Sequence, residues 1–179
     1  FCISEFGTAE AARIGLAVTH LQMGADPFWR PPTSEARLRA RKALSVQDSF
    51  VVLTVADNQE RKNHPGAVDA IKRLAELYPK VFWILVTKKR PEGIGYNLWD
   101  LVQRAGLSRH VYVIDTPVSR ERLRDLYGLA DACLVVSKAE GYCLPVIEAM
   151  ACGCPSVVSD LCELPLLVSG RGLTIRKEY

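Results

Sequence analysis

The sequence has no apolar run long enough to cross a membrane as a helix, and its start does not read as a signal peptide. It also lacks a strong charge of one sign. Its formal net charge of +3 argues against a protein that binds nucleic acid electrostatically. Basic clusters at 37–42 and 120–124 fall at helical spacing, so we predict that their arginines lie on solvated helix faces. Internal repeats and low-complexity tracts are absent, and the first residue is Phe1, so we expect a piece of a larger protein.

Histidine is scarce, and the cysteines do not form a metal-binding pattern. The Cys152-Gly153-Cys154 stretch lacks the usual two-residue spacer and has no histidine nearby, so we expect no metal. Cys133 lies in an apolar run and Cys152 at the end of an apolar helix pattern, where thiols act as small buried hydrophobes. Hydrophobic residues make up 49% of the chain, enough for a core without disulfides. We therefore expect free cysteines and a reducing, cytoplasmic location.

Strand and helix patterns alternate along most of the chain. Apolar runs predict six strands, at 50–56, 81–87, 109–115, 131–137, 154–159 and 172–175. Helices are predicted between them, beginning at caps such as Asn63 and Ser119. Such alternation indicates right-handed crossovers. The fold class is therefore α/β, a Rossmann-like parallel sheet with helices on both faces.

The first fifty residues follow a different pattern. Residues 4–16 resemble a helix and 17–23 a strand. A rigid, proline-rich connection follows at 26–32, and a charged helix at 34–44.

Two glutamates, Glu140 and Glu148, lie eight residues apart around a predicted strand-to-helix turn. The helix should begin near Leu144, with Pro145 in its first turn, and end at Gly153. It is apolar nearly all round, so Glu148 should point into a covered space where a ligand hydroxyl could be its partner. Taken singly, each glutamate is better explained as a solvated surface residue, because acidic side chains usually lie outside. The residues around them reverse this preference. The loop itself, at the carboxyl end of a parallel strand and the start of a helix, is typical of phosphate binding.

The stretch from Ala130 to Pro155 closely resembles the nucleotide-sugar-binding signature of retaining glycosyltransferases of the GT-B fold. This group includes sucrose synthases and many bacterial mannosyl- and glucosyltransferases. Arg61-Lys62-Asn63 resembles the family's Arg-Lys-Gly loop, and Gly24-Ala25-Asp26 with Phe28 and Pro31 resembles its passage into the second domain. The sequence departs from the family at Asp57, where an arginine is usual, and at Cys143, where glycine is usual.

The resemblance implies a role for each matched residue. Glu140 and Lys62 would be the catalytic pair, with Glu140 on the donor sugar and Lys62 on the diphosphate leaving group. Glu148 would accept hydrogen bonds from the ribose hydroxyls, and Arg61 would assist Lys62. The remaining donor-binding contacts would come from Gly141, Tyr142, Cys143 and Leu144. No cofactor is implied beyond a UDP- or GDP-linked donor, and no metal, since the family lacks a metal-binding Asp-x-Asp and none is present here.

The resemblance also implies a domain division and an activity. Residues 1–30 would be an interdomain connector of helix and strand, and 31–179 the nucleotide-sugar-binding domain, without the C-terminal helices and the acceptor domain. The reaction would be metal-independent, retaining hexosyl transfer, for which this fragment alone would be inactive. Membrane contact would arise only through the missing domain, and no nucleic acid is expected. Two alternatives are a sugar-nucleotide epimerase of the same fold and a non-catalytic nucleotide-binding partner subunit.

Overall fold

The computed structural model describes residues 1–88 and 95–176 and contains a six-stranded parallel sheet. The strands are β1 (Phe50–Val55), β2 (Val81–Val86), β3 (Val111–Ile114), β4 (Ala132–Val135), β5 (Ser156–Ser159) and β6 (Leu173–Ile175). The helices are α1 (Glu5–Arg13), α2 (Ser34–Ala43), α3 (His64–Leu77), α4 (Leu98–Arg104), α5 (Arg120–Leu129), α6 (Leu144–Ala151) and α7 (Leu164–Val168), with a short 3-10 turn, η1, at Glu60–Lys62. All six predicted strands of the sheet are confirmed.

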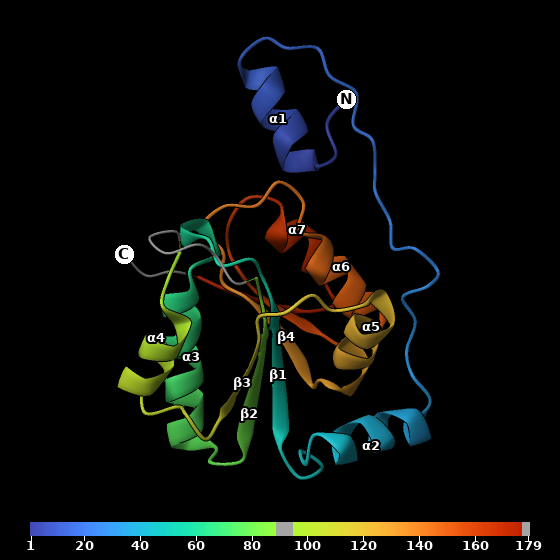
Figure 1. The fold of residues 1–179 in the computed structure, drawn as a ribbon. Helices are drawn as coiled ribbons and strands as arrows, with labels where there is room; N and C mark the ends of the chain where they lie inside the picture. Colours follow the sequence, from blue (N-terminus) through green and yellow to red (C-terminus); the bar gives the residue numbers. More distant parts are fainter. Residues whose placement is uncertain (89–94, 177–179) are drawn as a thin grey trace.

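The sheet order is β3-β2-β1-β4-β5-β6, and helices cover both faces (Figure 1). Because side chains alternate along a strand, β1 contributes side chains to two separate hydrophobic cores, one on each face of the sheet. Val51 and Leu53 pack with α5, α6 and α7, whereas Val52 packs with α3 and α4. The predicted Rossmann-like α/β fold with two covered faces is confirmed.

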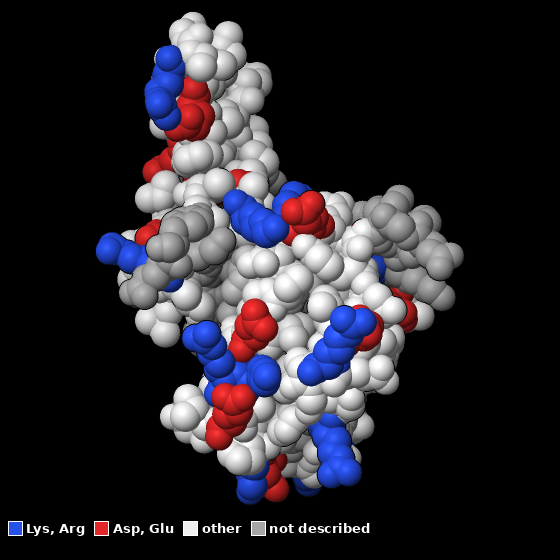
Figure 2. Space-filling view, turned by 90° about the vertical axis from the view of Figure 1, so that its left-hand side faces the viewer, with Lys and Arg blue, Asp and Glu red and all other residues white. Residues whose placement is uncertain are grey.

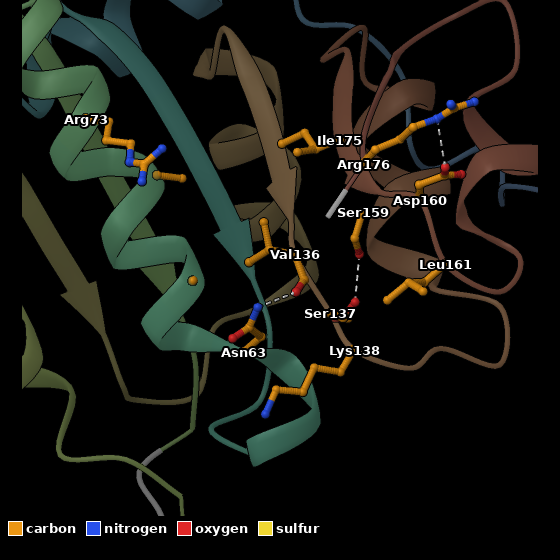
Figure 3. Close-up of a pocket in the computed structure, with 12 residues that line it drawn as sticks. Asn63, Arg73, Val136, Ser137, Lys138, Ser159, Asp160, Leu161, Ile175 and Arg176 are labelled. Carbon is orange, nitrogen blue, oxygen red and sulfur yellow. Dashed lines mark hydrogen bonds and ion pairs between the residues drawn. The ribbon is translucent and has the colours of Figure 1, made fainter. Parts of the chain in front are cut away.

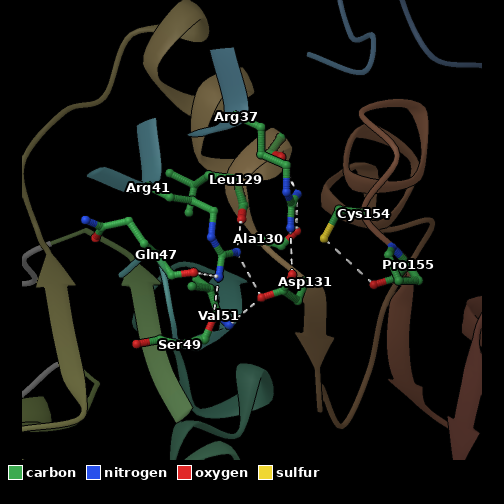
Figure 4. Close-up of polar contacts among 11 residues, drawn as sticks. Arg37, Arg41, Gln47, Ser49, Val51, Leu129, Ala130, Asp131, Cys154 and Pro155 are labelled. Atoms are coloured by element: carbon green, nitrogen blue, oxygen red, sulfur yellow. Dashed lines mark hydrogen bonds and ion pairs between the residues drawn. The ribbon is translucent and has the colours of Figure 1, made fainter. Parts of the chain in front are cut away.

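The helix α2 is held against the sheet by buried charge rather than lying on a solvated face. Arg41 is only 8% exposed, and its guanidinium bonds Asp131 Oδ2 at 3.0 Å (Figure 4). Arg37 bonds Asp131 Oδ1 at 2.6 Å. Arg41 also donates to the backbone carbonyls of Gln47, Ser49 and Leu129. The prediction of a solvated cluster is therefore wrong for Arg37 and Arg41, because Asp131, about ninety residues away, gives both guanidinium groups a partner.

The N-terminal segment departs from the prediction in one respect. Its helix is present as α1, whose first turn is capped by the Ser4 hydroxyl at 3.0 Å from the Gly7 amide. The strand predicted at 17–23 is wrong, since that segment makes only one isolated bridge, between Cys2 and His20. A strand needs a neighbouring strand to satisfy its backbone, and this segment lies apart from the sheet (Figure 1).

Helix starts were predicted with mixed success. Ser119 caps α5 as expected, accepting from the Arg122 amide at 3.2 Å. Asn63 precedes α3, but its backbone is left-handed (φ 55°) and its side chain donates to the Val136 carbonyl instead of capping. Asparagine tolerates this conformation, so it can link two loops here. The helix α7 was not predicted, because five residues are too few to show a period.

Within residues 1–88 and 95–176, no helix combines the length and apolar composition needed to cross a bilayer. On the face drawn in Figure 2, basic and acidic side chains are interspersed rather than gathered by sign. That mixture matches the small net charge of the chain.

Candidate functional site

The strand order places the switch point of the sheet between β1 and β4, where a crevice is expected. The chain leaves β1 toward β2 on one side and leaves β4 toward β5 on the other. Loops that follow such a pair diverge, which opens a ligand-binding crevice at the carboxyl ends of the strands. Arg61 and Lys62 lie in η1, after β1, and Glu140 follows β4, so the topology brings these residues to one place.

Arg61, Lys62 and Glu140 form a compact ionic cluster at this crevice. Lys62 Nζ lies 2.5 Å from Glu140 Oε1, and Arg61 Nη1 lies 3.2 Å from Glu140 Oε2. The Glu140 side chain is only 5% exposed, Lys62 10% and Arg61 47%. Glu140 is therefore not a solvated loop residue. The ion pairs with Lys62 and Arg61 offset the free-energy cost of burying the Glu140 charge.

Backbone and amide contacts brace the two loops that carry these charges. The Lys138 amide donates to the Arg61 carbonyl at 2.7 Å. The Asn63 side chain donates to the Val136 carbonyl at 3.1 Å. The cluster is thus held by the loops themselves as well as by its ion pairs.

The predicted donor loop, residues 141–144, leads directly into α6. Gly141 is exposed, whereas Tyr142 and Cys143 are each 7% exposed. Cys143 precedes α6 with a left-handed backbone (φ 74°), a conformation that glycine adopts without strain, which fits the glycine of the signature that this stretch resembles. The first turn of a helix leaves amides without intrahelical partners, so the loop and Leu144 offer donors to an anion.

The ionic cluster lies close enough to this loop for its charges to affect the pKa of the Cys143 thiol. Burial raises the pKa of Cys143 to about 12, and the Glu140 carboxylate adds to the rise, while Lys62 and Arg61 oppose it. The thiol is therefore uncharged at neutral pH and is a buried side chain beside the cluster.

Glu148 lies one turn into α6, as predicted, but has a partner within the chain. The Tyr127 hydroxyl donates to Glu148 Oε2 at 2.9 Å. Burial raises the pKa of the Glu148 carboxyl above its usual value, opposed by this hydrogen bond and by the charge of Arg120. Tyr127 was missed because a separation of 21 residues carries no sequence signal. Among the described residues, no second side chain donates to Glu148, so a ligand hydroxyl remains a compatible additional partner.

The departure from the family pattern at Asp57 also has a clear place in the structure. Asp57 accepts a hydrogen bond from the Gln59 side-chain amide at 2.9 Å. Arg61, which the resemblance implies would assist Lys62, donates hydrogen bonds to Glu140 and to the Ala139 carbonyl. The structure thus places a guanidinium at the crevice despite the acid at position 57.

A pocket of about 970 Å³ lies beside this cluster, at the ends of β4, β5 and β6 next to α3 (Figure 3). Asn63, Lys138 and Arg73 line it, and Ser159 donates to the Ser137 carbonyl across its floor. None of the predicted site residues lines this pocket. A second cavity, of about 550 Å³, separates the N-terminal segment from α6 and α7, and Tyr142 lines it.

Tyr142 and Glu163 join the body of the domain to the N-terminal segment across the second cavity. The Tyr142 hydroxyl donates to the Met23 carbonyl at 2.5 Å. The buried Glu163 carboxylate accepts from the Phe6 amide, in the first turn of α1, at 2.8 Å.

Comparison with known sequences supports the interpretation of these motifs. The family description "Glycosyl transferases group 1" matches residues 37–170. The chain belongs to this family. It is 34% identical over 165 residues to a D-inositol 3-phosphate glycosyltransferase of Mycobacteroides abscessus, covering 90% of this chain and 34% of that protein. It is 33% identical over 124 residues to the serotype-specific mannosyltransferase WbdA of Escherichia coli, covering 69% of this chain and 15% of that protein.

Solved structures of glycosyltransferases with the GT-B fold share the architecture of this group 1 chain. Sucrose-phosphate synthase from Thermosynechococcus elongatus superposes with a TM-score of 0.83 at 24% identity, covering 99% of this chain and 45% of that one. Anabaena HepE in complex with UDP-glucose gives 0.84 at 22% identity, covering 98% and 49%. The chain thus spans less than half the length of these proteins and has the fold of one part of them.

Proposed function

We propose that this chain binds a UDP- or GDP-linked hexose at the crevice beyond β1 and β4, as the donor half of a retaining, metal-independent hexosyltransferase. The observation that carries the proposal is the convergence of Arg61 and Lys62 with Glu140 in front of α6. A departing nucleoside diphosphate needs fixed positive charge where its negative charge develops. Two cations and a helix start supply that charge from the protein alone.

Each part of the donor has a complementary group. Lys62, with Arg61, would hold the diphosphate, together with the amides of residues 141–144. Glu148 would accept from the ribose hydroxyls, and Glu140 would contact the sugar. Because Lys62 already pairs with Glu140, a bound diphosphate has to share that lysine.

Named relatives support the class of donor and reaction. HepE was solved with UDP-glucose, and WbdA is named a mannosyltransferase, so hexose transfer from a nucleotide is the activity we propose. Transfer is favoured over epimerisation because the relatives are named as transferases and synthases. All six cysteines are free in the structure, which fits the cytoplasmic location we propose.

The first test is a titration of UDP, GDP, ADP and their hexose conjugates into wild type and Lys62→Ala. A charge-assisted contact to phosphate contributes about 1.5–3 kcal/mol, so the variant should lose roughly ten-fold or more in affinity for the diphosphate. Lys72→Ala, at an exposed position on α3, is the matched control and should bind as wild type does. Equal affinity of Lys62→Ala and wild type would place the diphosphate elsewhere.

A further inference from the structure

The partner of Glu148 is a tyrosine that the rest of the core holds rigidly. Tyr127 is fully buried, and its ring packs edge-on against Trp29, with centroids 5.7 Å apart and planes at 83°. Burial is the largest cause that raises the pKa of its hydroxyl, which therefore keeps its proton and acts as a donor. A fixed ring leaves that hydroxyl little freedom, and it lies 2.9 Å from Glu148 Oε2.

We infer that Tyr127 is a positioning residue for nucleotide binding, which acts by holding one oxygen of Glu148 so that the other can accept from the ribose. The inference rests on the proposed function, since it assigns a ribose to Glu148. It adds a residue from α5, outside the loops of the crevice, to the binding machinery. Tyr127 itself touches no ligand in this arrangement.

The Tyr127 hydroxyl also affects the protonation of the Glu148 carboxyl. Among the described residues, Tyr127 and Arg120 on α5 both favour the charged form of the Glu148 carboxyl. The charge of Glu148 in turn raises the pKa of Cys133 on β4 and of Cys152 at the end of α6. Tyr127 is the one that bonds Glu148 directly. A donor to a carboxylate favours the charged form, and the charged form is the better acceptor for ribose hydroxyls.

A double-mutant cycle tests whether Tyr127 acts through Glu148. Tyr127→Phe keeps the ring in the core and is expected to weaken UDP or GDP binding by about ten-fold, as removal of a hydrogen bond to a charged group does. In a Glu148→Gln background the same change should have no further effect, because the carboxylate that it orients is gone. Tyr112→Phe, at an exposed position on β3, is the control for loss of a phenol and should leave affinity unchanged.

The pH dependence of binding separates positioning from packing. UDP-glucose and GDP-mannose suit this test because their diphosphates are esterified at both ends. Wild-type affinity should fall as the pH drops through the raised pKa of Glu148. In Tyr127→Phe this fall should begin at a higher pH, since the bond that lowered the Glu148 pKa is lost, and in Glu148→Gln it should disappear.

Three results would overturn the inference. The first is that Tyr127→Phe binds the nucleotide as tightly as wild type does. The second is that Tyr127→Phe lowers the affinity by the same factor in the wild-type and Glu148→Gln backgrounds, with no change in the pH profile of binding. Glu148→Asp, which keeps the charge but withdraws it from the hydroxyl, should bind nearly as weakly as Glu148→Gln; wild-type affinity for that variant would also reject the inference, whether or not Tyr127→Phe folds. If wild type binds neither nucleotide, the proposed function fails and this inference fails with it.

Discussion

At the scale of single residues, the Glu140 carboxylate forms ion pairs with the two cations that a diphosphate would need. Lys62 and Arg61 both face its carboxylate, which is almost completely buried. Before a ligand arrives, this arrangement keeps two basic side chains in place. If a diphosphate binds as we propose, the same carboxylate would be a like charge beside it.

We therefore expect Glu140→Gln to bind bare UDP or GDP more tightly than wild type. Removing one negative charge next to a phosphate relieves repulsion of about 1 kcal/mol even at high dielectric, which corresponds to roughly five-fold in affinity. Calorimetry on the two proteins measures the difference.

Glu60→Gln is the matched control for this change. Glu60 pairs with Lys138 near the same loops, but its side chain is 82% exposed, so its charge is well screened. It should leave affinity unchanged. Weaker binding of UDP or GDP by Glu140→Gln would indicate that the carboxylate serves mainly to orient the Lys62 side chain.

At the scale of the elements, Asp131 joins α2, β1 and β4. It pairs with Arg37 and Arg41 and also accepts from the Val51 amide at 2.8 Å. One carboxylate thus fixes a helix that precedes the sheet to the two strands that flank the crevice.

Asp131→Ala should destabilise the domain by about 3 kcal/mol, because it leaves the buried Arg41 guanidinium without its counter-charge. Urea unfolding measures the loss. Glu35→Ala, which breaks the exposed Glu35–Arg39 pair on the same helix, should change stability by less than about 0.5 kcal/mol. Similar effects of the two substitutions would mean that Asp131 does not hold α2.

The elements also show which structural features the sequence could predict. The strands β1 to β5 could be predicted because each is an apolar run between turn residues, a local property. Residues 17–23 are also apolar enough for a strand, but whether a run pairs depends on a neighbour that the pattern does not reveal. The same limit applies to Arg41, whose partner Asp131 is 90 residues away.

For the candidate site, the motif predicted residues but could not predict their contacts. Glu140, Lys62 and Arg61 were predicted separately, and the structure joins them into one cluster. Tyr127 could not be predicted as the partner of Glu148, because that contact depends on how α5 packs against α6. Asn63 was misassigned because its role lies between loops rather than within its own helix.

At the scale of the whole molecule, the chain contains the proposed donor site and spans about a third of its mycobacterial relative. We expect these 179 residues to bind a nucleoside diphosphate but to transfer no sugar by themselves, since the relatives are much longer and we propose that the acceptor binds outside the matched part. Release of UDP or GDP from the sugar nucleotide, followed with and without candidate acceptors, measures this. Robust transfer by the isolated chain would contradict the division of labour proposed here.

The position of β1 in the centre of the sheet has a consequence for synthesis on the ribosome. One edge of β1 pairs with β2 soon after both emerge, but the other edge waits for β4, about eighty residues later. Until then one edge of this apolar strand leaves its backbone N–H and C=O groups unpaired, the kind of surface that pairs with other chains and aggregates when chaperones do not shield it. The crevice lies at the carboxyl ends of these same two strands, so it can form only after β4 has been synthesised.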